Sequence, residues 1–360
     1  MTKPKNLSSE NKMKNKADMI SKLFTEQKNQ PAIYQPGVFW EKALEDILNP
    51  YLTLGMQKFR SNRVNLKYFV PTYGSPANGF ENGAVNEIIG SFDGKLNFKQ
   101  ELFIKRQFDG SAHALSDYRA FIISNKSRDP LGLSNFSESK IGQPIEHFKF
   151  NERWFSRSSL NYLLGLSFLL SITPKFKPKR ILEIGGGFGT LAEILGKSNL
   201  TDYQYIGLDL PPLFLIARDY VTRCLCLEKK GAITKNIPNG KIKFVDLKQF
   251  SFLPNWKIED IRGNIDFFVN FISFQEMEPN IVKNYVFHIQ RLKPKWILLR
   301  NMREGKQIAK HNNIGVKKPV KKKDYISYFD RYELVDTSVL EYGYQTIDGF
   351  NSEILVLKRK

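Results

Sequence analysis

Chemistry is most plainly suggested by a glycine-rich segment, Ile181-Leu182-Glu183-Ile184-Gly185-Gly186-Gly187-Phe188-Gly189. An apolar run that leads into closely spaced glycines predicts a strand, a sharp turn and the start of a helix. Backbone N–H groups at such a helix start can hold an anion, for example a carboxylate. The acidic side chain of Glu183 favours a ligand that also carries a cationic group, and it is poorly placed beside a pyrophosphate. The segment therefore indicates a ligand with an amino-acid end.

The same segment resembles the cofactor motif of class I S-adenosylmethionine-dependent methyltransferases. The acidic and glycine positions of that motif are matched in full, by Glu183, Gly185, Gly187 and Gly189. A dinucleotide-binding turn fits less well, because Thr190 stands where such a turn requires a small residue. The resemblance implies that these four residues bind S-adenosylmethionine.

Two aspartates follow at the ends of the next two expected strands. Asp209 lies 20 residues after Gly189, and an acidic side chain at this place can accept hydrogen bonds from ribose hydroxyls. Asp246 closes the third expected strand, where the resembled class often has an acidic residue near the adenine amino group. Both are expected to bind the cofactor. The alternative is that each caps the helix that follows it.

The segment after the fourth expected strand reads Asn270-Phe271-Ile272-Ser273-Phe274-Gln275-Glu276-Met277. Enzymes that methylate exocyclic base amines or glutamine often carry an Asn/Asp-Pro-Pro-aromatic run here, so the lack of proline favours transfer to oxygen. We expect Asn270 to touch the cofactor and Glu276 to accept the proton of the acceptor hydroxyl. The competing interpretation is that Glu276 opens the next helix. His113, at an expected helix start, is the second candidate for proton transfer, against a plain capping role.

The elements that must position these residues alternate regularly after Pro178. Strands are expected at 180–184, 205–208, 242–245, 265–271 and 296–299, and helices at 190–196, 212–227 and 281–292. This alternation predicts βαβ units and a parallel sheet. Two later β-prone runs, 332–340 and 354–358, have no helical pattern between them and predict a hairpin. The expected fold class is α/β, a Rossmann-like, seven-stranded, mostly parallel sheet with a terminal antiparallel hairpin.

The chain before this sheet is expected to form two further parts. Residues 1–30 hold seven lysines and three acidic residues, which predicts a basic tail that is disordered or loosely helical. Residues 31–155 mix helical patterns with glycine- and proline-rich loops, which predicts a mixed α+β region that covers the acceptor. Residues 156–360 are then the methyltransferase domain. Its first helix carries Arg157 and Asn161 on one face, where they either reach a ligand or flank a buried helix.

Four segments together resemble the bacterial sugar O-methyltransferase family. They are Gly142-Gln143-Pro144-Ile145-Glu146-His147-Phe148, Arg153-Trp154-Phe155-Ser156-Arg157-Ser158-Ser159-Leu160-Asn161-Tyr162-Leu163, the glycine segment, and Asn270 to Met277. The resemblance spans roughly residues 35–360. It implies a sugar hydroxyl as the methyl acceptor, for example on a surface-polysaccharide precursor. The basic excess of the chain suits a nucleotide sugar.

Net charge limits the partners without naming one. The chain has 55 Lys and Arg against 36 Asp and Glu, a formal net charge of +19, and such an excess favours anionic partners. Much of it lies in residues 1–30 and in a second cluster at 303–323. We therefore expect a small-molecule or glycan acceptor that carries phosphate, and no nucleic acid. Two other functions stay open: an RNA methyltransferase, and a cofactor-binding scaffold without activity.

Other composition signals point to an intracellular protein. Cys224 and Cys226 have no distant cysteine partner, so no disulfide framework or zinc site can be built. The longest apolar stretch is too short for a bilayer, which predicts no membrane span and a cytoplasmic location. No metal-binding constellation stands out. A magnesium ion held by acidic residues near the site is left open, as is the oligomeric state.

Overall fold

A mixed eight-stranded sheet organises the second half of the chain. The computed structural model describes residues 9–69, 83–125, 129–309, 315–345 and 350–360. The strand order is β10-β12-β9-β8-β3-β4-β6, and a short β11 also pairs with β12. The strands are β3 (Arg180–Ile184), β4 (Gln204–Asp209), β6 (Phe250–Pro254), β8 (Phe267–Phe271), β9 (Trp296–Met302), β10 (Tyr332–Ser338), β11 (Tyr344–Gln345) and β12 (Asn351–Arg359).

The direction of these strands matches the predicted fold class in most respects. β3, β4, β6, β8 and β9 pair in parallel, and β12 is antiparallel to both β9 and β10. The predicted α/β fold with a mostly parallel sheet is therefore confirmed. The seven-stranded form with a closing hairpin is matched only in part, because the sheet has eight strands and β11 lies between β10 and β12 in the chain. Because parallel strands end at one edge, the residues that follow β3, β4, β6 and β8 meet there.

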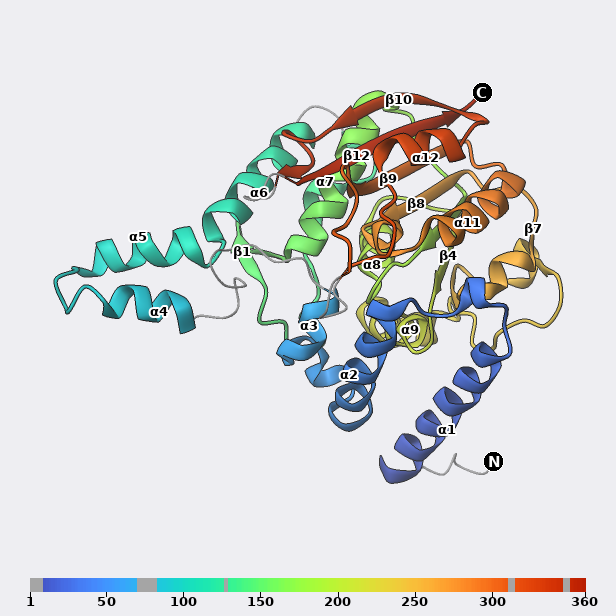
Figure 1. Ribbon diagram of the computed structural model, residues 1–360, viewed down its shortest axis with the longest axis horizontal. Coiled ribbons are helices and arrows are strands. Elements are labelled where there is room, and N and C mark those ends of the chain that lie inside the picture. The colour runs from blue at the N-terminus through green and yellow to red at the C-terminus, as the bar shows by residue number, and fades with distance from the viewer. Residues whose placement is uncertain (1–8, 70–82, 126–128, 310–314, 346–349) are drawn as a thin grey trace.

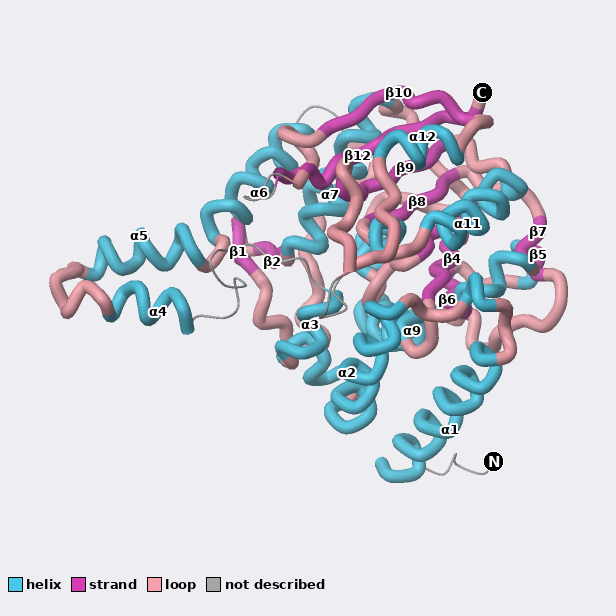
Figure 2. The backbone as a smooth tube through the Cα atoms, viewed as in Figure 1, coloured by secondary structure: helices cyan, strands magenta, loops and turns pink. Residues whose placement is uncertain are grey.

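Helices cover both faces of the sheet (Figure 1 and Figure 2). One face packs against α7 (Arg157–Ile172), α8 (Thr190–Lys197) and α9 (Leu213–Leu225), with α10 (Leu227–Lys230) following. The other packs against α11 (Pro279–Leu292) and α12 (Lys322–Tyr328). The central strands are largely buried, as β8 illustrates with five buried residues, because helices cover both faces. Within the described residues, no helix combines the length and apolar character needed to cross a membrane.

One predicted strand is not part of the central sheet. Residues 242–245 were expected to be its third strand, but they form only β5 (Ile242–Lys243), which pairs with β7 (Ile261–Arg262) in a separate two-stranded sheet. The third strand is β6, which pairs with β4. Phe250, Phe252 and Leu253 fill the core from β6. The correction matters because it changes which residue follows the third strand.

The region before the sheet is more helical than predicted. It contains α1 (Ser9–Lys28), α2 (Val38–Leu54), α3 (Arg63–Phe69), α4 (Gly83–Gly90), α5 (Phe98–Phe108) and α6 (Ser111–Asn125), with one hairpin of β1 (Phe148–Phe150) and β2 (Arg153–Phe155). The segment predicted to be a disordered or loosely helical tail is α1 from Ser9 onward. Ile20 and Leu23 are buried in the main core, and this burial stabilises α1 despite its polar composition.

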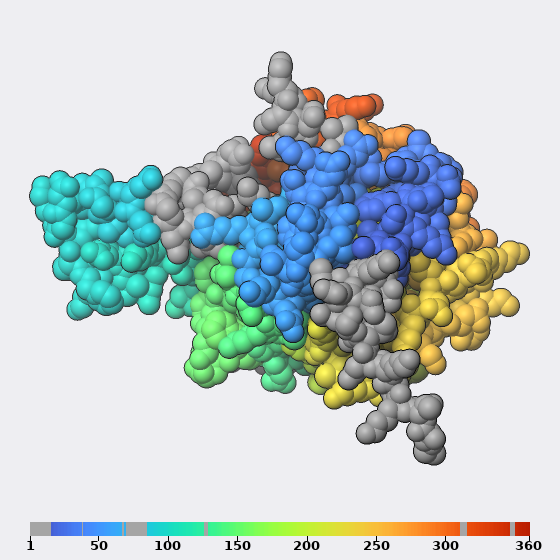
Figure 3. Space-filling view, turned by 90° about the horizontal axis from the view of Figure 1, so that it is seen from below, coloured from blue at the N-terminus to red at the C-terminus, as the bar shows by residue number. Residues whose placement is uncertain are grey.

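Two helices project from the body as an arm, the segment α4–α5 (Figure 3, in cyan). Glycine and proline content predicted loops here, but α5 begins with a capping box. Asn97 accepts the backbone N–H of Gln100, and the Gln100 side chain accepts the backbone N–H of Asn97. The helix has no buried residue, and Phe98 and Phe103 are exposed.

A buried cation joins the helical region to the sheet domain. Arg60 is fully buried, and its guanidinium donates to Glu138 at 2.6 Å, to Glu146 at 2.7 Å and to the Tyr220 hydroxyl at 2.9 Å. Burial alone would raise the pKa of Glu138, but the charge of Arg60 holds it well below its ordinary value. Glu138 also accepts the backbone N–H of Ser156, the N-cap of α7.

Arg60→Met is expected to lower the free energy of unfolding by about 3–5 kcal/mol, because two buried carboxylates lose their counter-charge. Urea unfolding followed by circular dichroism measures this. Lys179→Met is the matched control, since its ion pair with Asp202 is exposed, and it should cost under about 1 kcal/mol. Equal losses in the two variants would contradict the role assigned to Arg60.

Candidate functional site

A cavity of about 550 Å³ lies at the carboxyl edge of the parallel strands. Its floor is the glycine turn after β3 and the residues that follow β4, β6 and β8. Its wall comes from the helical region before the sheet and from α7, and the segment after β9 closes the remaining side. The lining residues used below are Phe39, Trp40, Tyr68, Phe69, Asn161, Tyr162, Gly185, Gly186, Gly187, Asp209, Asn255, Ser273, Glu276, Glu278 and Lys317.

The glycine turn has the shape that the sequence predicted. Gly185, Gly187 and Gly189 have φ values of 71°, 58° and 98°, a region that side chains other than glycine rarely adopt. A Cβ atom on Gly185 would lie 2.1 Å from the Ser273 Oγ atom, so the turn packs directly on the segment after β8. Gly185, Gly186 and Gly187 line the cavity, and none of them has a side chain of its own between its backbone and a ligand.

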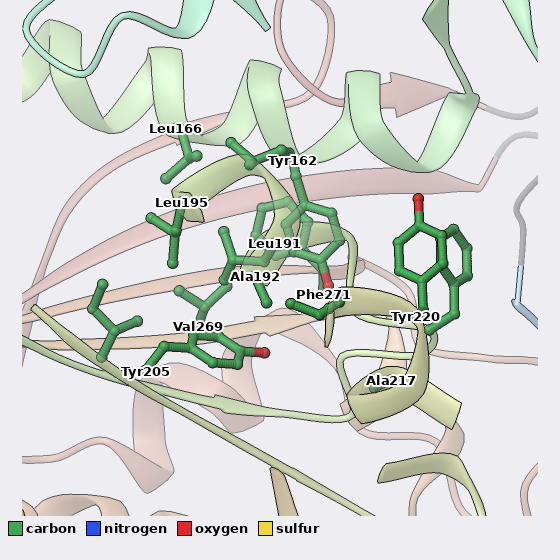
Figure 4. Close-up of a cluster of buried hydrophobic side chains, with 14 of the residues drawn as sticks. Tyr162, Leu166, Leu191, Ala192, Leu195, Tyr205, Ala217, Tyr220, Val269 and Phe271 are labelled. Carbon is green, nitrogen blue, oxygen red and sulfur yellow. The ribbon is translucent and has the colours of Figure 1, made fainter. Parts of the chain in front are cut away.

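Glu183 lies underneath this turn and not on the cavity surface. Its carboxylate is fully buried and accepts hydrogen bonds from the hydroxyls of Tyr162, at 2.7 Å, and Tyr205. Figure 4 shows Tyr162, on α7, and Tyr205, on β4, in the packed layer between helix and sheet. Burial raises the pKa of Glu183 to about 7, and the two tyrosine donors oppose that rise. A ligand in the cavity would meet Tyr162, which lines it, and not Glu183.

Asp209 is placed as predicted, at the end of β4 and on the cavity surface. Its Oδ1 atom accepts the backbone N–H of Leu210 at 2.8 Å. Burial raises the pKa of Asp209 to about 7. The hydrogen bond from the Leu210 N–H opposes this rise in pKa, and the nearby charge of Glu183 adds to it. The carboxylate can accept hydroxyl donors from a ligand in the cavity.

Three other predicted residues lie elsewhere. Asp246 is exposed and accepts the backbone N–H of Lys243, because residues 242–246 leave the central sheet. His113 is an exposed residue of α6 outside the cavity. Asn270 is fully buried behind the cavity floor and donates to the Ile184 carbonyl at 2.9 Å and to the Ser273 hydroxyl at 2.6 Å. Asn270 thus joins the glycine turn to the segment after β8 without facing the cavity.

Two asparagines carry the polar groups that the cavity leaves unpaired. Asn255 follows β6, where the sequence placed Asp246, and it is 3% exposed; Asn161, on α7, is 4% exposed. Among the described residues, neither Oδ1 atom has a hydrogen-bond donor. A buried acceptor without a partner is unfavourable, so each favours a ligand that brings an N–H or O–H group. Asn161 was a candidate from its helix face, whereas Asn255 was missed because the third strand was misplaced.

Glu276, the predicted proton acceptor, lines the cavity. Its Oε1 atom lies 2.5 Å from the Lys306 ammonium, and each of the two side chains is 13% exposed. Lys306 also lies over the Phe39 ring, 4.6 Å from its centroid. Glu276 therefore faces the aromatic wall formed by Phe39, Trp40 and Tyr68. In the described ranges, no three side chains of His, Cys, Asp or Glu are grouped so as to hold a metal ion.

Comparisons with known proteins give matches only among solved structures. No family model and no curated protein matches the sequence. Magnesium protoporphyrin IX methyltransferase (ChlM) from Synechocystis PCC 6803 with bound SAM matches 57% of this chain and 81% of its own, at 12% identity and a TM-score of 0.38. The methyltransferase domain of bacterial CtHen1-C matches 56% of this chain and 98% of its own, at 12% identity and a TM-score of 0.39. Mitomycin 7-O-methyltransferase MmcR matches 57% of this chain and 58% of its own, at 13% identity and a TM-score of 0.33.

Likeness at this level carries no argument about a shared substrate. The resemblance to the bacterial sugar O-methyltransferase family therefore stays a prediction from the quoted segments. Function is inferred below from the site of this chain.

Glu183→Gln is expected to change how stability depends on pH. The carboxyl ionises at about 4.5 when unfolded and at about 7 in the fold, so the wild type loses stability as pH rises through this window. The variant lacks this loss, and its free energy of unfolding relative to wild type should rise by roughly 3 kcal/mol between pH 4 and pH 8. Urea unfolding at several pH values measures it. Glu333→Gln, at an exposed position of β10, is the control, and parallel profiles for all three proteins would refute the assignment.

Proposed function

We propose that this chain is an S-adenosylmethionine-dependent O-methyltransferase whose acceptor is a sugar hydroxyl. The observation that carries the proposal is the cavity itself. It is lined by the glycine turn, by a carboxylate at the end of β4, by two asparagines with unpaired acceptors, and by Glu276 together with aromatic side chains. Such a cavity can hold a cofactor and an acceptor side by side at the carboxyl edge of a parallel sheet.

The cofactor end fits S-adenosylmethionine group by group. The backbone N–H groups of Gly185 to Gly187 suit the cofactor carboxylate. Asp209 suits the ribose hydroxyls, since a carboxylate can accept two hydrogen bonds at once. The unpaired Oδ1 atoms of Asn255 and Asn161 suit the adenine amino group and the α-ammonium group, which are both donors. A cofactor with a net positive charge is also favoured by the acidic lining.

The acceptor end supports transfer to a hydroxyl. When bound, the cofactor supplies a methyl group on a sulfonium; the new bond joins that carbon to the acceptor oxygen as the carbon–sulfur bond breaks. Glu276 accepts the proton of the acceptor hydroxyl, with its Oε1 atom held by Lys306. The aromatic wall excludes water and orients the acceptor, so that proximity contributes much of the rate. His113 takes no part, because it lies outside the cavity.

The cofactor assignment is tested by calorimetric titration with S-adenosylhomocysteine and, separately, with NAD. We expect binding of S-adenosylhomocysteine alone. Asp209→Asn should weaken it about 10- to 100-fold, because charge-assisted hydrogen bonds to the ribose are lost. Asp246→Asn is the matched control and should bind as the wild type does, since Asp246 is exposed and remote from the cavity. Failure of the wild type to bind S-adenosylhomocysteine would overturn the proposed function.

Methyl transfer is tested with radiolabelled S-adenosylmethionine and a panel of hexose and deoxyhexose acceptors. Glu276→Gln should lower the rate on any accepted sugar by about 100-fold or more, while binding of S-adenosylhomocysteine stays close to wild type. Glu304→Gln, a change in the neighbouring segment outside the cavity, and His113→Ala should keep the wild-type rate. Transfer to RNA instead of sugars would establish the rival methyltransferase function.

A further inference from the structure

The charge of the cavity is opposite to the charge of the chain. The chain carries a formal net charge of +19, yet the charged residues that line the described cavity are three carboxylates, Asp209, Glu276 and Glu278, and one lysine, Lys317. Lys317 is exposed, and its backbone N–H donates to Glu278 at 2.7 Å. Among the described lining residues, a bound molecule therefore meets more carboxylates than ammonium groups, although the chain as a whole is positive.

The ammonium beside the aromatic wall is already neutralised. Lys306 lies 2.5 Å from Glu276, and little of either side chain is exposed to water. A partly buried pair of this kind is screened much less than a surface pair, so its charges cancel locally. Arg157, next to the lining residue Ser158, does not line the cavity, and its guanidinium lies over the Tyr344 ring at 4.1 Å. Among the described lining residues, no buried cation is left for a phosphate group.

The aromatic wall suits a ring without charge. The Phe39 ring meets Trp40 at a centroid distance of 5.5 Å and Tyr68 at 5.9 Å, both edge to face, so the rings present differently oriented surfaces. Ring faces of this kind pack against the C–H groups of a sugar ring, while Glu276 accepts its hydroxyls.

We propose that the acceptor subsite, formed by Phe39, Trp40, Tyr68 and Glu276, selects an uncharged sugar ring over a phosphorylated or nucleotide-linked one. This inference rests on the proposed function and refines it. It also replaces the expectation of a phosphate-bearing acceptor, which came from net charge alone. The selectivity lies in Glu276, because its carboxylate occupies the Lys306 ammonium, which could otherwise attract a phosphate.

The test measures binding to the protein saturated with S-adenosylhomocysteine. Isothermal titration compares methyl hexopyranosides with the corresponding hexose 6-phosphates and uridine diphosphate hexoses. Wild type should bind the best neutral ligand at least about tenfold more tightly than its phosphorylated counterpart, as expected for like charges brought together. In Glu276→Gln the freed Lys306 ammonium should reverse or abolish this preference. The double variant Glu276→Gln with Lys306→Met should bind the phosphorylated ligands weakly again.

Glu304→Gln is the matched control, since it removes a carboxylate two residues from Lys306 but outside the cavity, and it should keep the wild-type preference. A phosphorylated ligand that binds wild type as tightly as the neutral one would overturn the inference. The inference would also be overturned if Glu276→Gln left the ratio of the affinities for the neutral and the phosphorylated ligand unchanged. If no sugar of either kind binds or is methylated although S-adenosylhomocysteine binds, the sugar acceptor itself fails, and the inference fails with it while the cofactor assignment stands.

Discussion

The buried guanidinium of Arg60 is the constraint on which the arrangement of the site depends. A desolvated cation must be matched by carboxylates, and here Glu138 and Glu146 come from the segment that leads into α7. The same guanidinium lies over the ring of Phe188, 4.6 Å from its centroid, and Phe188 belongs to the glycine turn. One side chain of the helical region thereby holds both the start of α7 and the turn that faces the cavity. The wall and the floor of the cavity cannot be positioned independently.

From Arg60 the polar contacts continue into the sheet domain. Tyr220, on α9, accepts a hydrogen bond from Arg60 and donates to the buried Glu193 at 2.7 Å. A second contact of this kind starts from α7, where the Tyr162 hydroxyl donates to Glu183 beneath the glycine turn. Two buried carboxylates, each reached through a tyrosine hydroxyl, thus fix α7, α8 and α9 around β3. Since unpaired buried carboxylates are costly, this network favours one placement of the helices and hence one shape of the cavity.

Sequence reasoning succeeded where local chemistry decides the structure and failed where distant contacts do. The strand–turn–helix around Gly185 was predicted because closely spaced glycines after an apolar run are typical of a sharp turn, and these glycines do have positive φ values. Asp209 was predicted from its spacing after the turn. Asp246 was misplaced because 242–245 and β6 are both short apolar runs, and only pairing with β4 distinguishes them. Asn255 was missed for the same reason. The helix α1 is polar enough to suggest disorder, and what orders it is the burial of Ile20 and Leu23 by residues far along the chain.

Net charge and the cavity lining favour different acceptors, for a related physical reason. The net charge of +19 is a property of the whole protein, and it affects the long-range attraction of a ligand before the ligand enters the cavity. Inside a cavity, contact distances are shorter than the screening length, so the few groups that line it outweigh the many on the surface. Lys306 illustrates the difference, because it counts toward the positive total, yet its charge is offset by Glu276, 2.5 Å away. The sign of a binding site therefore has to be read from its lining, and here the lining favours a cationic cofactor beside a neutral acceptor.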